Sequence, residues 1–258
     1  MKLNFISRNL WGLVLLFSFL GCGAGCKNPL QKVAPADAKT YNYEHFRLNQ
    51  HKERVFIQPG EIFPDITVFD LDGKPFQLST LWKDRTLVLE TGSITCPIFV
   101  GKISKMDALM KKYKEKANFA ILAVREAHPG EKFSHQTSFQ QKLTQARSIQ
   151  DLEKTQRQIL VDSLDGVLHQ KIGTHPNTAY VIAKGGKTLV RFEWVDEDLL
   201  DQILDRIGTM EFEANIAGFY QEKAIQQKEL NARVLKRAGE RAVKDFNEAF
   251  PWNWAQIK

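Results

Sequence analysis

The sequence is poor in cysteine, and the placement of its cysteines limits the chemistry open to the chain. Three cysteines occur among 258 residues, two of them within the first 26, and none follows Cys96. A dithiol oxidoreductase would carry a second cysteine three positions after the first, where this chain has Phe99. The main part of the chain therefore cannot form an internal disulfide. Any redox chemistry there must use one thiol and be completed by an external thiol.

Strong charge of one sign and long apolar runs are also missing. Lys and Arg together number 36 against 30 Asp and Glu, a net charge of +6 that provides no basic stripe for a nucleic acid. The apolar run at residues 10–20 is 11 residues long, whereas a membrane-spanning helix needs roughly 20. With 43% hydrophobic residues, the chain can bury a core without disulfides. We expect no nucleic-acid partner, no metal and no bound cofactor.

The N-terminus has the features of an export signal. Its apolar run has the length of a signal-peptide core, about 7–15 residues. The following Leu20-Gly-Cys22 is similar to the lipobox of bacterial lipoproteins, in which the cysteine becomes the lipidated first residue. We predict a signal peptide at residues 1–21, lipidation of Cys22, and a protein anchored by its lipid to a bacterial membrane, on the periplasmic or cell-surface face. An ordinary signal peptide or an uncleaved anchor is the alternative, and Cys26 is expected to be a bystander.

The rest of the chain divides by its periodicity into a tether at residues 22–55, an α/β domain at 56–210 and a helical extension at 211–258. Runs typical of strands occupy residues 66–70, 75–78, 86–91, 119–124, 159–161, 179–182 and 188–194. Helical spacing occupies residues 97–116, 139–152 and 198–210. This alternation predicts a mixed sheet flanked by helices. In the extension, apolar residues from 216 to 235 predict one long amphipathic helix, packed on the domain or on a second copy of the chain.

Cys96 occupies a demanding local context. It follows a predicted buried strand and a short turn that contains Ser93 and Thr95, and it precedes Pro97, which suits the first position of a helix. At a helix N-terminus the dipole and the free backbone N–H groups stabilise a thiolate. We therefore expect Cys96 to be reactive, with Ser93 and Thr95 donating hydrogen bonds to its sulfur or to a substrate.

Two segments resemble a known family. Gly92-Ser-Ile-Thr-Cys-Pro-Ile-Phe99 is similar to the active-site segment of the iodothyronine deiodinases, with cysteine at the family's selenocysteine position. Glu126-Ala-His-Pro129 is similar to a second deiodinase segment, and residues 60–81 resemble the opening of thioredoxin-fold proteins of the redoxin class. The resemblance covers roughly residues 56–194 and implies a thioredoxin-like fold.

The resemblance also implies roles for individual residues. Cys96 would be the nucleophile that attacks a halogen or another soft electrophile. Ser93, Thr95, Glu126 and His128 would form the hydrogen-bond and proton-relay network around it. A histidine near its ordinary pKa could protonate the leaving group. The implied partners are a small-molecule substrate and a thiol reductant or reductase.

The walls of the substrate groove are also implied by the fold. They would include Pro97, Phe99 and His175, with Pro176 as the cis-proline that thioredoxin folds place opposite the active cysteine. The arginine that would clamp the carboxylate of thyroid hormone is replaced by Thr178, which argues against that substrate.

Two other functions are compatible with the same residues. A one-cysteine peroxidase would form a sulfenic acid at Cys96, and the spacing of Ser93 and Cys96 fits the hydroxyl and cysteine of peroxiredoxins. A non-catalytic thioredoxin-like binding module would use the groove near Pro176 together with the C-terminal helix. The first reading, a single-cysteine oxidoreductase of deiodinase type, is the one that the paired motifs favour.

Overall fold

A computed structural model describes residues 41–48, 57–173, 175–207, 214–216, 227–252 and 255–258, with the backbone alone for 214–216. These residues all belong to one compact unit. The predicted signal peptide, Cys22, Cys26 and the domain boundaries at 56 and 210 lie outside them. No helix within the described ranges is both long enough and apolar enough to cross a membrane.

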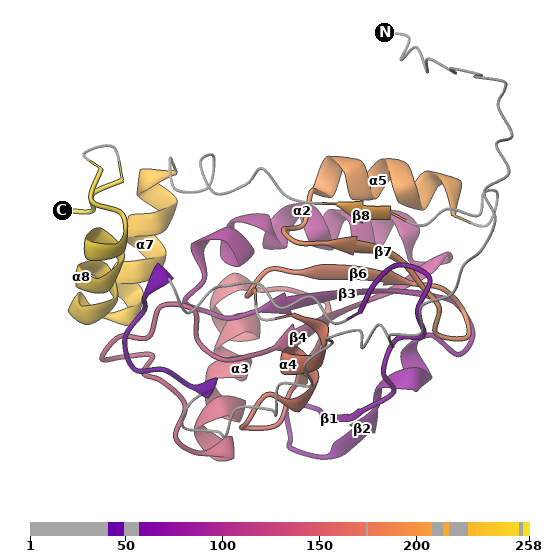
Figure 1. Ribbon diagram of the computed structural model, residues 1–258, viewed down its shortest axis with the longest axis horizontal. Coiled ribbons are helices and arrows are strands. Elements are labelled where there is room, and N and C mark those ends of the chain that lie inside the picture. Colours follow the sequence, from indigo (N-terminus) through magenta and orange to yellow (C-terminus); the bar gives the residue numbers. More distant parts are fainter. Residues whose placement is uncertain (1–40, 49–56, 174, 208–213, 217–226, 253–254) are drawn as a thin grey trace, which may run out of the picture. The chain divides into compact units, whose positions relative to one another are not determined.

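One mixed sheet of eight strands forms the center of the described structure (Figure 1). Its strand order is β2-β1-β5-β4-β3-β6-β7-β8. The strands are β1 (Thr67–Phe69), β2 (Pro75–Gln77), β3 (Thr86–Gly92), β4 (Ala117–Ala123), β5 (Gln158–Val161), β6 (Ala179–Ile182), β7 (Thr188–Phe192) and β8 (Ala214–Ile216). The pairs β3–β4, β4–β5 and β7–β8 are parallel, and the remaining pairs are antiparallel. The predicted mixed α/β sheet with a thioredoxin-like arrangement is confirmed.

Helices cover both faces of this sheet because its central strands are apolar on both sides. On one face, Val88 of β3 and Ile121 of β4 pack under α2 (Pro97–Tyr113), α3 (Phe139–Glu153) and α5 (Glu197–Arg206). On the other face, Leu87 and Leu89 of β3 pack with the short helix α4 (Val167–Ile172) and the 3-10 turn η2 (Leu78–Leu81). The alternation of neighbouring residues between faces follows the two-residue period of a strand.

The pairing of β3 with β4 positions the site. The two strands run parallel, with Gly92 opposite Ala123 at their carboxyl ends. The backbone N–H of Val124 then donates to the carbonyl of Gly92 at 3.0 Å, which continues the pairing beyond the strands. The turn that leads to Cys96 and the turn that contains His128 therefore emerge side by side at one edge of the sheet, as the sequence predicted.

The C-terminal extension is helical, but it is not one long helix. Residues 214–216 form the edge strand β8, and two helices follow, α7 (Lys228–Ala238) and α8 (Glu240–Ala249). They lie together at one end of the sheet in Figure 1. Gly239 separates them with a φ of +134°, a conformation that favours glycine, and a side chain there would meet the backbone of Glu131. The expectation of one long helix from residue 216 to 235 is wrong, because Ile216 lies in β8 and α7 begins only at Lys228.

Candidate active site

Cys96 lies where the sequence placed it, between β3 and α2. It is the N-cap residue of α2 in an extended conformation, and Pro97 is the first helical residue. A side chain at Gly92 would collide with the ring of Phe99, so this glycine lets the turn close tightly over the helix. Pro97 and Phe99, predicted as groove residues, are buried with Cys96 rather than presented to solvent.

The environment of the Cys96 thiol differs from the one we expected. Cys96 is 2% exposed, and this burial raises the pKa of its thiol to about 12. The backbone N–H groups of Phe99 and Ile98 at the helix N-terminus act in the opposite direction, but they do not compensate for the burial. The prediction of a stabilised thiolate is thus wrong for this closed arrangement, although its geometric basis is present.

The hydroxyl groups of Ser93 and Thr95 bind the neighbouring turn. Ser93 Oγ accepts a hydrogen bond of 3.1 Å from the backbone N–H of Ala127. Thr95 Oγ1 donates to Glu126 Oε2 at 2.6 Å and accepts from the backbone N–H of His128 at 3.1 Å. We predicted that both hydroxyls would face the sulfur or a substrate. Their hydrogen bonds instead fasten the turn at residues 126–128 to the turn before Cys96.

Glu126 is a buried acid directly beside the thiol turn. Its carboxyl group accepts from both the backbone N–H and the hydroxyl of Thr95, at 3.1 and 2.6 Å. Burial raises the pKa of Glu126 to about 7, and the hydrogen bonds from Thr95 and Ser93 and the charge of Lys142 lower it only in part. The group therefore exchanges its proton near neutral pH, the range in which a general acid or base is most effective.

The His128 ring lies between aromatic side chains. Its centroid is 4.2 Å from that of Phe46 and 5.6 Å from that of Phe246 on α8. The residue is 8% exposed, and burial lowers the pKa of His128 to about 3. Its Nδ1 atom has no hydrogen-bond partner among the described residues. The expectation of an imidazole near its ordinary pKa is therefore wrong for this arrangement, in which the ring is neutral at neutral pH.

The other two predicted groove residues lie on the loop before β6. The peptide bond between His175 and Pro176 is trans, so the prediction of a cis-proline is wrong. The carbonyl of His175 accepts from Thr91 Oγ1 at 2.9 Å, which ties this loop to the end of β3. The His175 ring stacks on Trp194 at a centroid distance of 5.0 Å. Thr178 is fully buried, and its hydroxyl donates to the carbonyl of Glu193 at 3.3 Å, so this side chain does not offer a clamp for a substrate carboxylate.

Several site residues come from segments that sequence analysis assigned elsewhere. Tyr43 and Phe46, within the predicted tether, are buried against the turn at residues 126–128. From the extension, Val234 joins the apolar cluster that contains Cys96, and Arg237 donates to the carbonyl of Ile94 at 2.8 Å. The closely spaced aromatic residues Tyr41, Tyr43 and Phe46 signal burial, although the segment is too short to show the period of a helix or strand.

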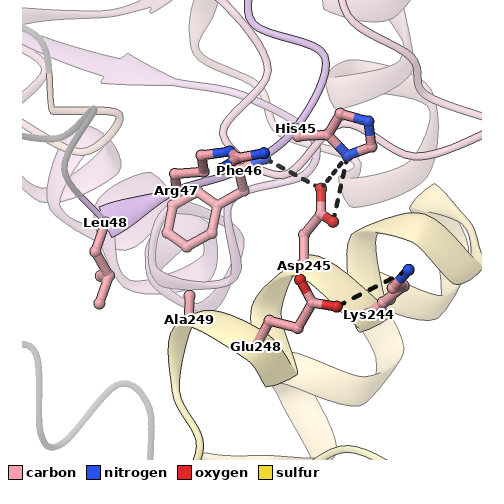
Figure 2. Close-up of a pocket in the computed structure, with 8 residues that line it drawn as sticks. All are labelled: His45, Phe46, Arg47, Leu48, Lys244, Asp245, Glu248 and Ala249. Carbon is pink, nitrogen blue, oxygen red and sulfur yellow. Dashed lines mark hydrogen bonds and ion pairs between the residues drawn. The ribbon is translucent and has the colours of Figure 1, made fainter.

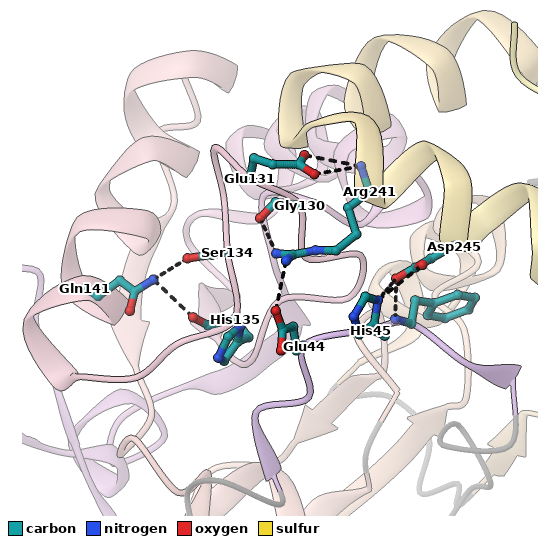
Figure 3. Close-up of polar contacts among 10 residues, drawn as sticks. Glu44, His45, Gly130, Glu131, Ser134, His135, Gln141, Arg241 and Asp245 are labelled. Atoms are coloured by element: carbon teal, nitrogen blue, oxygen red, sulfur yellow. Dashed lines mark hydrogen bonds and ion pairs between the residues drawn. The ribbon is translucent and has the colours of Figure 1, made fainter.

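Polar contacts hold these segments over the site. Arg241 Nη2 donates to the carbonyl of Gly130 at 2.7 Å, and its Nη1 lies 3.0 Å from Glu44 (Figure 3). Asp245 Oδ2 accepts from the backbone N–H of Phe46 at 3.1 Å and lies 3.1 Å from His45 Nδ1. Figure 2 shows the contact between His45 and Asp245 at the wall of a cavity of about 540 Å³ between residues 45–48 and α8. Residues 44–46 and α8 together form a cover over His128.

The described residues contain no group of three or more His, Cys, Asp or Glu side chains placed to hold a metal ion. The chemistry that this site offers comes from one thiol, one carboxyl group with a pKa near neutral and a neutral imidazole. Residues 31–188 match the family model of iodothyronine deiodinase. The chain belongs to the iodothyronine deiodinase family.

Individual relatives are consistent with that membership. Type I iodothyronine deiodinase from Xenopus laevis is 25% identical over 146 residues, which cover 52% of this chain and 56% of that protein. Thyroxine 5-deiodinase from Sus scrofa is 28% identical over 111 residues, which cover 40% of this chain and 36% of that protein. The chain thus spans about half or less of the length of these relatives. Family membership relates it to oxidoreductases.

A solved structure supports the fold independently. An uncharacterized conserved protein from Geobacillus kaustophilus superposes with a TM-score of 0.52 at 14% identity, covering 64% of this chain and 90% of the other. At that identity the likeness concerns the fold alone.

Proposed function

We propose that this protein is a single-cysteine oxidoreductase that removes halogen from, or otherwise reduces, a small soft electrophile through Cys96. The observation that carries the proposal is the junction of the two family segments. Cys96 stands at the N-terminus of α2, and the residue before it shares a hydrogen bond with the buried carboxyl group of Glu126. A nucleophile and a proton-exchanging acid are thereby held on adjoining turns.

The proposed reaction uses only groups of known chemistry. The Cys96 thiolate attacks the halogen of an aryl halide, so that the carbon–halogen bond breaks, a sulfur–halogen bond forms and the aryl carbon accepts a proton. A first external thiol displaces halide from the sulfur, forms a mixed disulfide with Cys96 and loses its proton. A second thiol reduces this mixed disulfide and restores Cys96. Two thiols are oxidised to a disulfide for each substrate reduced.

Glu126 is the group that we assign to proton transfer. The pKa of Glu126 is raised to about 7 by burial, so its protonated form is available at neutral pH. Burial lowers the pKa of His128 to about 3, so its ring is neutral at neutral pH and is a poor proton donor. We assign the ring of His128 to the wall of the site, where it would pack against an aromatic substrate as it now packs against Phe46.

Access to Cys96 requires that the cover move. The thiol is buried in an apolar cluster that includes Val234 of α7. The cover lies over His128 on the neighbouring turn. Displacing the cover would hydrate the sulfur and allow the N–H groups of α2 to lower the pKa of Cys96. The proposed substrate lacks the carboxylate of thyroid hormone because the position of the expected clamp is the buried Thr178.

The cellular setting is part of the same proposal. The N-terminal residues support export and a lipid anchor at Cys22, which would hold the enzyme on a bacterial membrane at the periplasmic or cell-surface face. An external thiol or a thiol reductase there would supply electrons, and no bound cofactor would be needed. A second copy of the chain remains a proposed partner for the extension.

Mass spectrometry of Cys96 tests the reaction type. The full chain, with Cys22→Ser and Cys26→Ser so that one thiol remains, is mixed separately with peroxide and with iodophenol. The proposal predicts a sulfenyl iodide adduct on Cys96 with iodophenol alone, and free iodide together with a mixed disulfide once a thiol is added. Rapid sulfenic acid formation with peroxide and no iodide release would instead identify a peroxidase. A thiol that reacts with neither would overturn both and leave a binding module.

A further inference from the structure

Tyr43 reaches the thiol site from outside the sequence region of the two family motifs. It lies in the segment before β1, yet it is 9% exposed, and its hydroxyl donates to the carbonyl of Ala127 at 3.0 Å. The guanidinium of Arg125 lies 4.8 Å from the center of its ring. A buried tyrosine hydroxyl normally has such a partner, and here the partner belongs to the turn between Glu126 and His128.

Ala127 is held through both of its backbone polar groups. Its N–H group donates to Ser93 Oγ at 3.1 Å, while its carbonyl accepts from Tyr43. Ser93 belongs to the turn before Cys96, whereas Tyr43 belongs to the N-terminal segment. Ala127 is therefore the link between these two parts of the chain. Without the Tyr43 hydroxyl, the buried carbonyl would lose its partner, and the turn would have to relax to find another.

We propose that Tyr43 is a positioning residue of the Cys96 site, whose hydroxyl fixes the Ala127 peptide and thereby holds the Glu126 carboxyl group beside the thiol. The carboxyl group reaches the backbone and hydroxyl of Thr95 only while its turn stays in place. All three residues of this turn form hydrogen bonds with the hydroxyls of Ser93 and Thr95, and Tyr43 supplies the restraint from the other side.

Tyr43 is also a wall residue of a cavity. It lines a cavity of about 540 Å³ together with neighbouring polar side chains, among them His135 and Gln136. Cys96 and Glu126 both act electrostatically on its phenol, so the two groups lie near the ring that lines this cavity. A turn freed by loss of the hydroxyl would therefore admit water toward Glu126 and Cys96. The consequence is a measurable change in how the thiol titrates.

The direction of that change follows from the surrounding charges. Burial raises the pKa of Cys96, and the negative charge of Glu126 raises it further. Water entry and movement of the carboxyl group would thus both lower it. The titratable and charged groups that surround Cys96 and Glu126 on the packed elements are Tyr43, Glu90, Arg125, His128, Lys142 and Arg237.

A pair of tyrosine variants tests the proposal in the full chain carrying Cys22→Ser and Cys26→Ser. Tyr43→Phe keeps the ring against Arg125 and removes only the hydroxyl. Tyr41→Phe is the matched control, because Tyr41 is also buried, also lies near Arg125 at 5.0 Å, and pairs its hydroxyl with His169 at 2.6 Å. The measurements are the rate of Cys96 alkylation by iodoacetamide as a function of pH and the midpoint of urea unfolding.

We expect the two variants to lower the unfolding midpoint by similar amounts. Tyr43→Phe alone should move the inflection of Cys96 alkylation down by about 0.5–1 pH unit, a roughly 3–10-fold faster reaction at fixed pH below the inflection. A wild-type profile for Tyr43→Phe, or an equal shift in both variants, would overturn the assignment. As a second measurement, carbon NMR should show the pKa of Glu126 moving away from its value of about 7 only in Tyr43→Phe.

This assignment rests on Cys96 being the thiol of the proposed function, but the two fail in different ways. If wild-type protein releases no halide while Tyr43→Phe still shifts the alkylation profile, the positioning role stands and dehalogenation is wrong. If halide is released but the alkylation profile stays unchanged in Tyr43→Phe, dehalogenation stands and the positioning role is wrong.

Discussion

The hydroxyl of Thr95 donates a hydrogen bond of 2.6 Å to Glu126 and at the same time accepts one of 3.1 Å from the backbone N–H of His128. One side chain therefore joins the residue before Cys96 to both functional positions of the neighbouring turn. Since the two turns follow adjacent parallel strands, β3 and β4, their relative position is set first by the sheet and then by this hydroxyl. The role is structural for the turn and electrostatic for the acid.

Replacing that hydroxyl by a methyl group should weaken the fold and the site together. Thr95→Val leaves the N–H of His128 buried without its acceptor and removes a hydrogen bond that lowers the pKa of Glu126. We expect a loss of about 1–3 kcal/mol in the free energy of unfolding and a higher pKa for Glu126. Urea unfolding and carbon NMR provide the two values.

Thr144→Val is the matched control for this variant. The Thr144 hydroxyl donates to the carbonyl of Gln140 at 3.0 Å, but on the exposed side of α3. We expect a change within about 0.5 kcal/mol there. Equal losses in the two variants would show that the Thr95 hydroxyl has no special role.

Glu126 should give the stability a recognisable pH dependence. Its pKa is about 7 in the folded protein and near 4.5 when unfolded, so the folded state holds the proton to higher pH. Its contribution to stability is present in full below about pH 4.5 and is lost as the pH rises through 7. Glu126→Gln has no titrating group at this position. The free energy of unfolding of the variant should therefore rise relative to that of wild type across this pH window, by on the order of 2–3 kcal/mol.

Glu131→Gln provides a control of opposite sign. The pKa of Glu131 is lowered in the folded protein, in part by the backbone N–H of Arg241, so its contribution is lost as the pH falls. Urea unfolding at a series of pH values compares the three proteins. Parallel curves for wild type and Glu126→Gln would contradict the raised pKa.

The sequence was sufficient for strands β1 to β7, for the helix after Cys96 and for the meeting of the two motifs at one sheet edge, but not for β8. Those features depend on local apolar patterns and on the rule that parallel strands end together. The state of the thiol could not be predicted in the same way. The thiol is buried in an apolar cluster that includes Val234, which lies far away in the chain. A helix dipole is readable from sequence, whereas desolvation is a sum over distant contacts.

The roles of the hydroxyls and of His128 were missed for a similar reason. Spacing placed Ser93 and Thr95 next to Cys96, but it could not show that their hydrogen bonds go to the turn at residues 126–128. His128 was located correctly, yet its pKa depends on Phe46 and Phe246, neither of which belongs to the motif. Short motifs define which residues meet, and packing decides their protonation.

The cover should control how fast Cys96 reacts. Asp245 on α8 accepts a hydrogen bond from the backbone of Phe46, whose ring covers His128. Asp245→Ala removes this tie, so local opening should become easier and Cys96 alkylation at pH 8 should accelerate by roughly tenfold. Mass spectrometry of timed samples measures the rate.

An acid on another face controls for general loosening. Asp201 on α5 accepts hydrogen bonds from Lys112 at 2.7 Å and from Tyr113 at 2.6 Å. We expect Asp201→Ala to leave the alkylation rate within about twofold of wild type, because α5 does not cover the site. The same acceleration in both variants would contradict a specific role for the cover.

A buried ion cluster beneath β3 should dominate the stability of the domain. Arg157 pairs with Glu90 on β3 and with Asp107 on α2, where Nε and Oδ1 are 2.8 Å apart. Arg157→Met leaves the Glu90 carboxylate buried without its cation, and we expect a loss of about 3–5 kcal/mol in the free energy of unfolding. Arg147→Met, which removes an exposed ion pair, should cost at most about 1 kcal/mol. Similar losses would refute the cluster's importance.

Iodide release under turnover conditions is the most direct measurement of the central claim. The full chain with Cys22→Ser and Cys26→Ser is incubated with iodophenol and excess dithiol, beside the same protein carrying Cys96→Ser. Release that continues beyond one iodide per protein, and that falls to the background of dithiol alone in Cys96→Ser, is the predicted result. Equal release by the two proteins, or none above background from either, would contradict Cys96 as the dehalogenating nucleophile.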